Sequence, residues 1–209
     1  MEKFHISTSI RGKVLVKKAN KPRVQLVGFH GYAEDAEIMF KRLESLSIPE
    51  ASLISVQALH PFYKKDGTVV ANWMTKDDRE LAIEDNINYI GNVLKELTDS
   101  VAPVICLGFS QGVAMAYRTA FYFPDKISAL VNLGGDLPPE LSNMQIESKL
   151  RIAIARGDSD PYYLAQQFET DCKNLISNGF EISKLSFSGA HDWNDEFNKL
   201  CTEFIESQI

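Results

Sequence analysis

Short runs of β-branched and other apolar residues alternate along the chain with longer stretches in which apolar residues recur every three or four positions. The short runs have the length and composition of strands, and the longer stretches have the period of amphipathic helices. Strands are predicted at residues 3–9, 12–18, 23–29, 52–57, 103–109, 127–133, 150–156 and 181–187. This alternation is typical of an α/β protein with a mostly parallel sheet.

Five amphipathic helices are predicted in the gaps between these strands. In the clearest one, Ile83, Ile87 and Ile90 recur with the helical period. The other four contain the apolar positions from Met39 to Leu46, Val113 to Phe121, Leu164 to Leu175, and Phe197 to Ile205.

The connections predict how the strands pair and where a ligand would bind. We expect strands 3–9 and 12–18 to pair antiparallel, because the link between them is too short for a crossover helix. The later strands follow a helix or a long connection, which favours parallel pairing. Residues 58–76 and 134–149 lack a clear period and follow the ends of strands. Ligands bind at that edge of open α/β sheets, so both segments are predicted to form pocket walls.

Composition and charge mainly exclude classes of protein and of binding partner. The 209 residues are 44% hydrophobic and 24% charged, which suits one domain that spans residues 1–209. A net charge of −6 without a basic cluster disfavours nucleic-acid binding. The N-terminus lacks a signal-peptide core, and no apolar run approaches the roughly 20 residues that cross a bilayer. Three cysteines without metal-ligand spacing, Cys106, Cys172 and Cys201, indicate a reducing compartment. We therefore expect a cytoplasmic protein without stable membrane insertion.

The most specific motif is Gly108-Phe109-Ser110-Gln111-Gly112, which stands directly between a predicted strand and a predicted helix. Where Gly-x-Ser-x-Gly joins a strand directly to a helix, the chain makes a sharp turn that lifts the serine hydroxyl above the edge of the sheet. The two glycines leave room for that turn. Composition alone predicts only about 0.05 such matches by chance. Ser110 is therefore predicted to be a nucleophile.

A serine hydroxyl is a weak nucleophile unless a histidine accepts its proton and a carboxylate orients that histidine. His191 lies between the last predicted strand and the last predicted helix, where the base belongs in the order Ser, acid, His. The other histidines are interpreted as a strand-face residue (His5), a brace of its own loop (His30) and a structural or solvent-facing residue (His60).

Two aspartates compete for the role of the acid. Asp158 and Asp160 both follow the strand at 150–156. Asp160 is favoured because Asp158 could instead cap the turn at Gly157, whereas Asp160 directly precedes the proline that starts the next helix. Asp158 stays the alternative, and Asp136 and Asp192 fit the order less well.

Acyl transfer also needs donors for the tetrahedral oxyanion. The backbone N–H of Gln111 is one, because it lies at the start of the helix after the nucleophile. Gly31 allows the loop after the strand at 23–29 to turn inward, so the N–H of Tyr32 is predicted to be the second donor.

Four motifs resemble the small phospholipase/carboxylesterase (acyl-protein thioesterase-like) family of α/β-hydrolases. In chain order they are His30-Gly31, Gly-Phe-Ser-Gln-Gly, Gly157-x-x-Asp160 and Gly189-x-His191. The resemblance runs from about residue 23 to the end of the chain. It implies a Ser110, Asp160, His191 triad, and it favours Asp160 further because the family's acid stands three residues after the glycine. It also implies an α/β-hydrolase fold, here a central, mostly parallel eight-stranded sheet flanked by helices. Because eight strands and five helices account for the 209 residues, we expect no separate lid domain.

We interpret the chain as a serine carboxylesterase that forms an acyl-enzyme with a small-molecule ester and needs neither a metal nor an organic cofactor. Acyl thioesterase or lysophospholipase action is the alternative, and a non-catalytic ligand-binding hydrolase fold is the remote one. The family's Val-Pro pair after the acid is replaced by Tyr162-Tyr163-Leu164, so its substrate specificity is not carried over. The sequence leaves the oligomeric state open, a homodimer included.

Several bulky side chains follow strand ends at the predicted catalytic edge, and they are the candidates for substrate binding. They are Phe62, Tyr63, Trp73, Leu137, Tyr162 and Trp193. A ring of such residues around a lidless site predicts a graded preference for short acyl chains of roughly two to six carbons.

Overall fold

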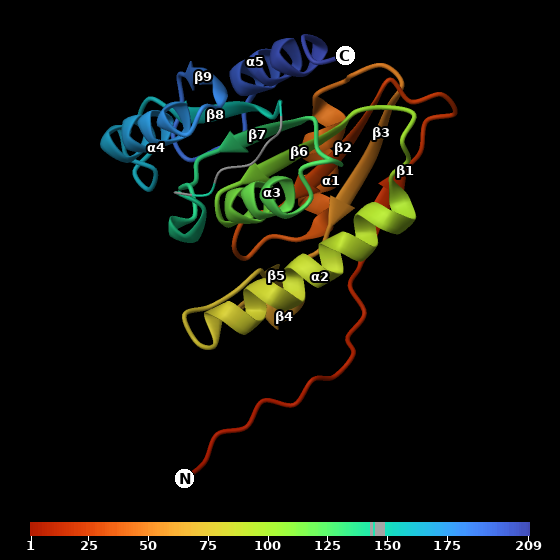
Figure 1. Cartoon of the computed structure of the whole chain (residues 1–209), viewed down its shortest axis with the longest axis vertical. Helices are drawn as coiled ribbons and strands as arrows, with labels where there is room; N and C mark the ends of the chain where they lie inside the picture. The colour runs from red at the N-terminus through yellow and green to blue at the C-terminus, as the bar shows by residue number, and fades with distance from the viewer. Residues whose placement is uncertain (143, 145–148) are drawn as a thin grey trace.

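The computed structural model of the chain describes residues 1–142, 144 and 149–209. Seven strands in this part form one sheet in the order β1-β3-β2-β6-β7-β8-β9 (Figure 1). They are β1 (Val14–Lys17), β2 (Val24–Phe29), β3 (Ala51–Val56), β6 (Val104–Phe109), β7 (Ala129–Leu133), β8 (Arg151–Gly157) and β9 (Glu181–Phe187). β1 runs antiparallel to β3, and the other pairs are parallel.

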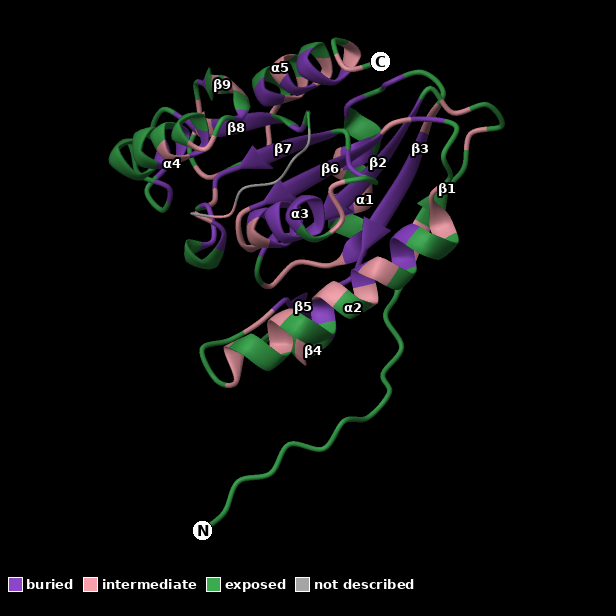
Figure 2. Ribbon diagram, in the orientation of Figure 1, coloured by how far each residue is buried: buried purple, intermediate pink, exposed green. Residues whose placement is uncertain are grey.

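Helices cover both faces of the sheet, which is why the central strands β2, β6 and β7 are buried throughout (Figure 2). Strands that are buried on both faces are almost continuously apolar. The helices are α1 (Ala36–Ser45), α2 (Arg79–Leu97), α3 (Gln111–Tyr122), α4 (Ala165–Ser177) and α5 (Asp195–Glu206). The apolar residues of α1 and α5 pack into one core cluster, and those of α2, α3 and α4 pack into the other. The predicted helices and the α/β class are confirmed.

The N-terminal strand prediction is wrong. Residues 1–13 carry no strand and are exposed, so the described sheet has seven strands instead of eight. The alternation around Phe4 and Ile6 suits a strand, but a strand also needs a neighbour, and none lies beside this segment. The antiparallel partner of β1 is β3, with Val14 opposite Val56.

The two segments without a clear period differ in structure. Residues 58–76 contain a hairpin of β4 (His60–Tyr63) and β5 (Val69–Asn72), which the sequence did not predict. Pro61 in β4 has no N–H to donate, which suits an isolated two-stranded ribbon. The segment 134–149 contains a short 3₁₀ helix, η1 (Pro139–Leu141), and its residues 143 and 145–148 lie outside the described part.

The order of the strands reverses between β2 and β6. From β2 the chain continues to β3 on one side, and from β6 it continues to β7 on the other. The loops that follow β2 and β6 therefore diverge and leave a crevice at the carboxyl edge of the sheet, where ligands of open α/β sheets bind. In the described helices, none is both long and apolar enough to cross a membrane.

Candidate active site

Ser110 lies on the turn that joins β6 to α3. Its φ of 52° and ψ of −120° are a combination that residues with a side chain rarely adopt. A Cβ atom at Gly108 would lie 2.6 Å from the Cα of Val113, and one at Gly112 would lie 2.1 Å from the carbonyl oxygen of Phe29. Glycine at both positions is what allows the chain to make this turn, as the Gly-x-Ser-x-Gly motif predicts.

His191 and Asp160 are brought together from two loops. Asp160 follows β8, His191 follows β9, and these strands are neighbours in the sheet. The Nδ1 atom of His191 lies 2.8 Å from Oδ2 of Asp160. The aspartate side chain is 1% exposed and the imidazole 15%. With the proton held on Nδ1 by the carboxylate, the lone pair of Nε2 is free to accept a proton.

The second oxygen of Asp160 fixes the carboxylate in place. Oδ1 accepts hydrogen bonds from the backbone N–H groups of Tyr162 at 2.8 Å and Tyr163 at 2.9 Å. Asp158, the alternative acid, is exposed and accepts a hydrogen bond from the N–H of Gly189 at 3.2 Å. Of the two candidate aspartates, Asp160 is therefore the one that contacts His191.

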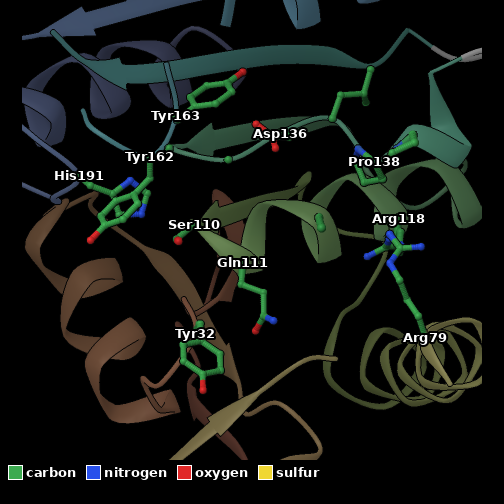
Figure 3. A pocket seen from close by; sticks show the side chains of 15 residues that line it. Tyr32, Arg79, Ser110, Gln111, Arg118, Asp136, Pro138, Tyr162, Tyr163 and His191 are labelled. Atoms are coloured by element: carbon green, nitrogen blue, oxygen red, sulfur yellow. The ribbon is translucent and has the colours of Figure 1, made fainter. Parts of the chain in front are cut away.

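Ser110 and His191 line the same cavity (Figure 3). In the described part of the chain, no hydrogen bond joins the Ser110 hydroxyl to the imidazole. Such hydrogen bonds are often long in the absence of substrate and shorten when it binds.

The two predicted oxyanion donors, the backbone N–H groups of Tyr32 and Gln111, belong to residues that line the same cavity as Ser110. Gln111 is the first residue of α3, so its N–H has no acceptor within the helix. The N–H of Tyr32 donates to no backbone acceptor among the described residues.

The loop that carries Tyr32 is braced by His30. The His30 ring is fully buried, its Nδ1 lies 2.7 Å from the Gly31 carbonyl oxygen, and its Nε2 accepts the N–H of Ala58 at 3.0 Å. Burial lowers the pKa of His30, which favours the neutral ring that these contacts need. The interpretation of His30 as a brace is confirmed. His60 is exposed, as expected, whereas His5 lies outside any strand and 3.1 Å from Asp78.

A charged pair holds the same loop from the other side. Glu34 accepts the N–H of Gly31 at 2.8 Å, and its two oxygens accept 2.6 and 2.8 Å hydrogen bonds from the guanidinium of Arg42. That guanidinium also lies 4.1 Å from the centre of the Phe109 ring, which packs against the imidazole of His191. This brace escaped the sequence reasoning, because Glu34 and Arg42 belong to no motif.

Replacing Glu34 by Ala is expected to lower kcat about ten-fold with little change in KM, because the Tyr32 N–H loses its fixed position while the cavity keeps its shape. Loss of the partly buried pair should also reduce the free energy of unfolding by about 1–3 kcal/mol. Steady-state kinetics and thermal unfolding measure the two effects. Glu37→Ala is the matched control, because Glu37 lies three residues further along, in α1, and forms an exposed ion pair with Lys13. An unchanged kcat in Glu34→Ala would show that this brace does not position the loop.

The cavity has a volume of about 680 Å³. Of the predicted substrate-binding residues, Leu137 and Tyr162 line it. The structure places Phe62, Tyr63, Trp73 and Trp193 outside this lining. Trp73 is fully buried and donates from Nε1 to the His30 carbonyl oxygen, Phe62 stacks on the Tyr32 ring, and Trp193 packs on Phe197.

Sequence reasoning missed two polar residues of the cavity, Arg79 and Arg118, and weighed Asp136, which also lines it, only as an acid. The Gln111 side chain fixes the chain at Trp73 and Met74 through two 3.0 Å hydrogen bonds. The sequence contains one indication that Arg118 is unusual, because it is a charged residue within the apolar stretch of residues 113–121. In the described residues no cluster of His, Cys, Asp and Glu could hold a metal ion, and the three cysteines are free and buried.

Comparisons with known proteins identify the family and similar folds. The sequence profile of the family described as Phospholipase/Carboxylesterase matches residues 11–209. The fold is similar to that of esterase PE8, with a TM-score of 0.79 and 20% identity over 96% of this chain and 100% of the other. The fold is also similar to that of acyl-protein thioesterase 2 of Zea mays, with a TM-score of 0.73 and 18% identity over 95% of this chain and 99% of the other. For a Bacillus cereus carboxylesterase the TM-score is 0.75, with 16% identity over 95% of both chains. A comparison with curated protein sequences gave no match.

Proposed function

The chain belongs to the phospholipase/carboxylesterase family of ester-hydrolysing α/β-hydrolases, and we propose that it cleaves carboxylic esters through an acyl-enzyme formed on Ser110. The observation that carries this proposal is the 2.8 Å contact between His191 Nδ1 and Asp160, in the cavity that Ser110 also lines. This contact leaves Nε2 as the basic atom of the imidazole, and the proposal assigns it the role of accepting the Ser110 proton.

In the first half of the reaction, His191 Nε2 takes the proton from the Ser110 hydroxyl as Oγ attacks the ester carbonyl carbon. The carbonyl oxygen becomes an oxyanion, which accepts hydrogen bonds from the N–H groups of Tyr32 and Gln111. The bond between the carbonyl carbon and the alkoxy oxygen then breaks, and the alcohol leaves with the proton from His191. Asp160 keeps the imidazole oriented and stabilises its charged form.

In the second half, water takes the place of the alcohol. His191 removes a proton from the water as its oxygen attacks the acyl carbon, and the same two N–H groups stabilise the second oxyanion. The bond to Ser110 Oγ breaks, Oγ regains the proton, and the carboxylic acid leaves. The protein is unchanged, and one ester and one water have become an acid and an alcohol.

For the substrate we propose esters with short- to medium-chain acyl groups. One end of the cavity is lined by the catalytic residues, and its far end is lined by the guanidinium groups of Arg79 and Arg118. A long apolar chain would place its end against the accessible guanidinium of Arg79 and displace its water, which is unfavourable. Thioester hydrolysis uses the same chemistry and is the alternative that the experiment decides.

A panel of p-nitrophenyl esters and the matching acyl thioesters tests this proposal. We expect kcat/KM to be highest for acyl chains of roughly two to six carbons and to fall gradually beyond them, because each methylene changes the binding free energy by only about 1–3 kcal/mol. Higher values for the thioesters would support a thioesterase. A steady rise up to palmitoyl esters would contradict the chain-length proposal, and no hydrolysis of any substrate would contradict the esterase proposal.

A further inference from the structure

One face of α3 forms a stripe that leads away from Ser110 along the cavity. Ser110, Ala114 and Arg118 follow one another at intervals of four residues, and all three line the cavity. Residues with this spacing lie on one face of a helix, so Arg118 lies about two turns, or about 12 Å of helix rise, beyond Ser110. Ala114 between them is small and leaves the path open. In Figure 3, His191 and Ser110 lie at one end of the cavity and Arg118 and Arg79 at the other.

Arg118 is a buried cation close to the far end of the cavity. The residue is 0% exposed. Its Nε and Nη2 both donate to Oε1 of Glu140, while Nη1 faces the sulfur of Met74 at 3.6 Å. A thioether is a weak acceptor, and a guanidinium carries five N–H donors. Because the side chain is fully buried, a ligand in the cavity is attracted by the charge of Arg118 and does not contact its N–H groups.

Charge is also unbalanced at this end of the cavity. Arg79 reaches the second oxygen of Glu140 at 3.5 Å, so two guanidinium groups share one carboxylate. Among the described residues, Glu140 is the only acid within ion-pair distance of either arginine. Burial, opposed by Glu140 and helped by the like charge of Arg79, lowers the pKa of Arg118. An anion at this place would relieve the repulsion between the two cations.

The direction of the reaction decides which part of a substrate reaches the arginines. The alcohol takes its proton from His191 and therefore leaves at the His191 end. The acyl group must then extend the other way, along α3 toward Arg118 and Arg79. A carboxylate matches the planar fork of a guanidinium better than other small anions do.

We propose that the accessible guanidinium of Arg79, with the charge of the buried Arg118 nearby, binds a carboxylate at the far end of the acyl group, so that the preferred substrates are monoesters of dicarboxylic acids, a proposal that rests on the esterase function above. Asp136 also lines the cavity, on the wall opposite α3, and its negative charge opposes this binding. The net charge of the group formed by Arg79, Arg118 and Glu140 is +1, which one carboxylate neutralises. The bonds that form and break are those already described, and the products are an alcohol and a free dicarboxylic acid.

The test compares esters that differ only in the end of the acyl chain. The mono-p-nitrophenyl esters of adipic and suberic acid are measured against p-nitrophenyl hexanoate and octanoate, with the rate without enzyme subtracted. We expect kcat/KM to be about ten-fold higher for the anionic ester of each pair in the native protein. In Arg79→Gln we expect this ratio to fall about five- to ten-fold.

Arg151→Gln is the matched control, because Arg151 also forms one ion pair at 3.5 Å, with Glu181 on the surface of the sheet. It removes the same charge from the protein and should keep the ratio within two-fold of the native value. A native ratio near or below one would overturn the proposal, as would a ratio that Arg79→Gln leaves unchanged.

A binding measurement separates this proposal from the esterase function. Adipate should raise the midpoint of thermal unfolding more than hexanoate does at equal concentration, and Arg79→Gln should abolish the difference. If the esters are not hydrolysed but adipate still stabilises the protein selectively, the carboxylate site stands and the esterase function fails. If the esters are hydrolysed without preference and adipate has no selective effect, the carboxylate site fails alone.

Discussion

Replacing Ser110 by Ala is expected to lower kcat by about four to six orders of magnitude for every ester that the native protein hydrolyses. The variant loses the oxygen that forms the acyl bond, whereas the Tyr32 and Gln111 N–H groups and the cavity remain. Rates measured with p-nitrophenyl butyrate in large enzyme excess give the residual activity. Alanine is small enough for the strained turn, so thermal unfolding should stay close to that of the native protein.

Fluorophosphonate labelling provides the check on this result. The probe forms a bond to an activated serine, so the native protein should be labelled at Ser110 and the variant should not. Ser159→Ala is a suitable control, since Ser159 lies close to the catalytic loops but donates its hydroxyl to the Gly189 carbonyl oxygen at 2.7 Å. Retention of even a tenth of the native activity in Ser110→Ala would disprove the assignment of the nucleophile.

The second large effect is expected from Asp160→Asn, which should lower kcat by about three to four orders of magnitude. An amide can turn its NH₂ group toward Nδ1 of His191, which favours the tautomer that carries its proton on Nε2. That tautomer cannot accept the proton of Ser110. Single-turnover rates with p-nitrophenyl acetate measure the loss of the acylation step.

Asp158→Asn is the matched control for this change. Asn keeps an oxygen that can accept the N–H of Gly189, so the loop between β8 and α4 should keep its structure. We expect its kcat to stay within about three-fold of the native value, since Asp158 does not contact His191. An inactive Asp158→Asn protein beside an active Asp160→Asn protein would reverse the assignment of the acid.

The sequence by itself predicted most of what depends on neighbouring residues. The strained turn at Ser110 requires glycine two residues before and after it, and both glycines are visible in the motif. The sheet and its helices were equally readable, because strands buried on both faces leave runs such as Val24–Phe29 and Val104–Phe109. The positions of Asp160 and His191 after two consecutive strands then placed both residues at one edge of the sheet, since parallel strands end on the same side.

Other features depend on contacts between distant segments, and only the tertiary structure decided them. Residues 3–9 have the alternation of a strand, but the sheet provides no neighbour for them. Asp158 and Asp160 differ by two positions in the sequence, and only the fold shows which carboxylate reaches Nδ1 of His191. Trp73 lies in a loop that follows a strand, yet its indole is buried against His30 instead of lining the cavity.

The charged residues at the far end of the cavity could not be predicted from the sequence either. Arg79 begins α2, Arg118 lies in the middle of α3, and Glu140 belongs to a 3₁₀ helix, so no local pattern connects them. Periodicity reports which face of an element is buried, because that property repeats along the chain. It carries no information on which charged side chains meet across the core, since that depends on how α2 and α3 pack together. The sequence therefore determined the fold class and the candidate catalytic residues, and the packing of the helices determined the shape and charge of the cavity beside them.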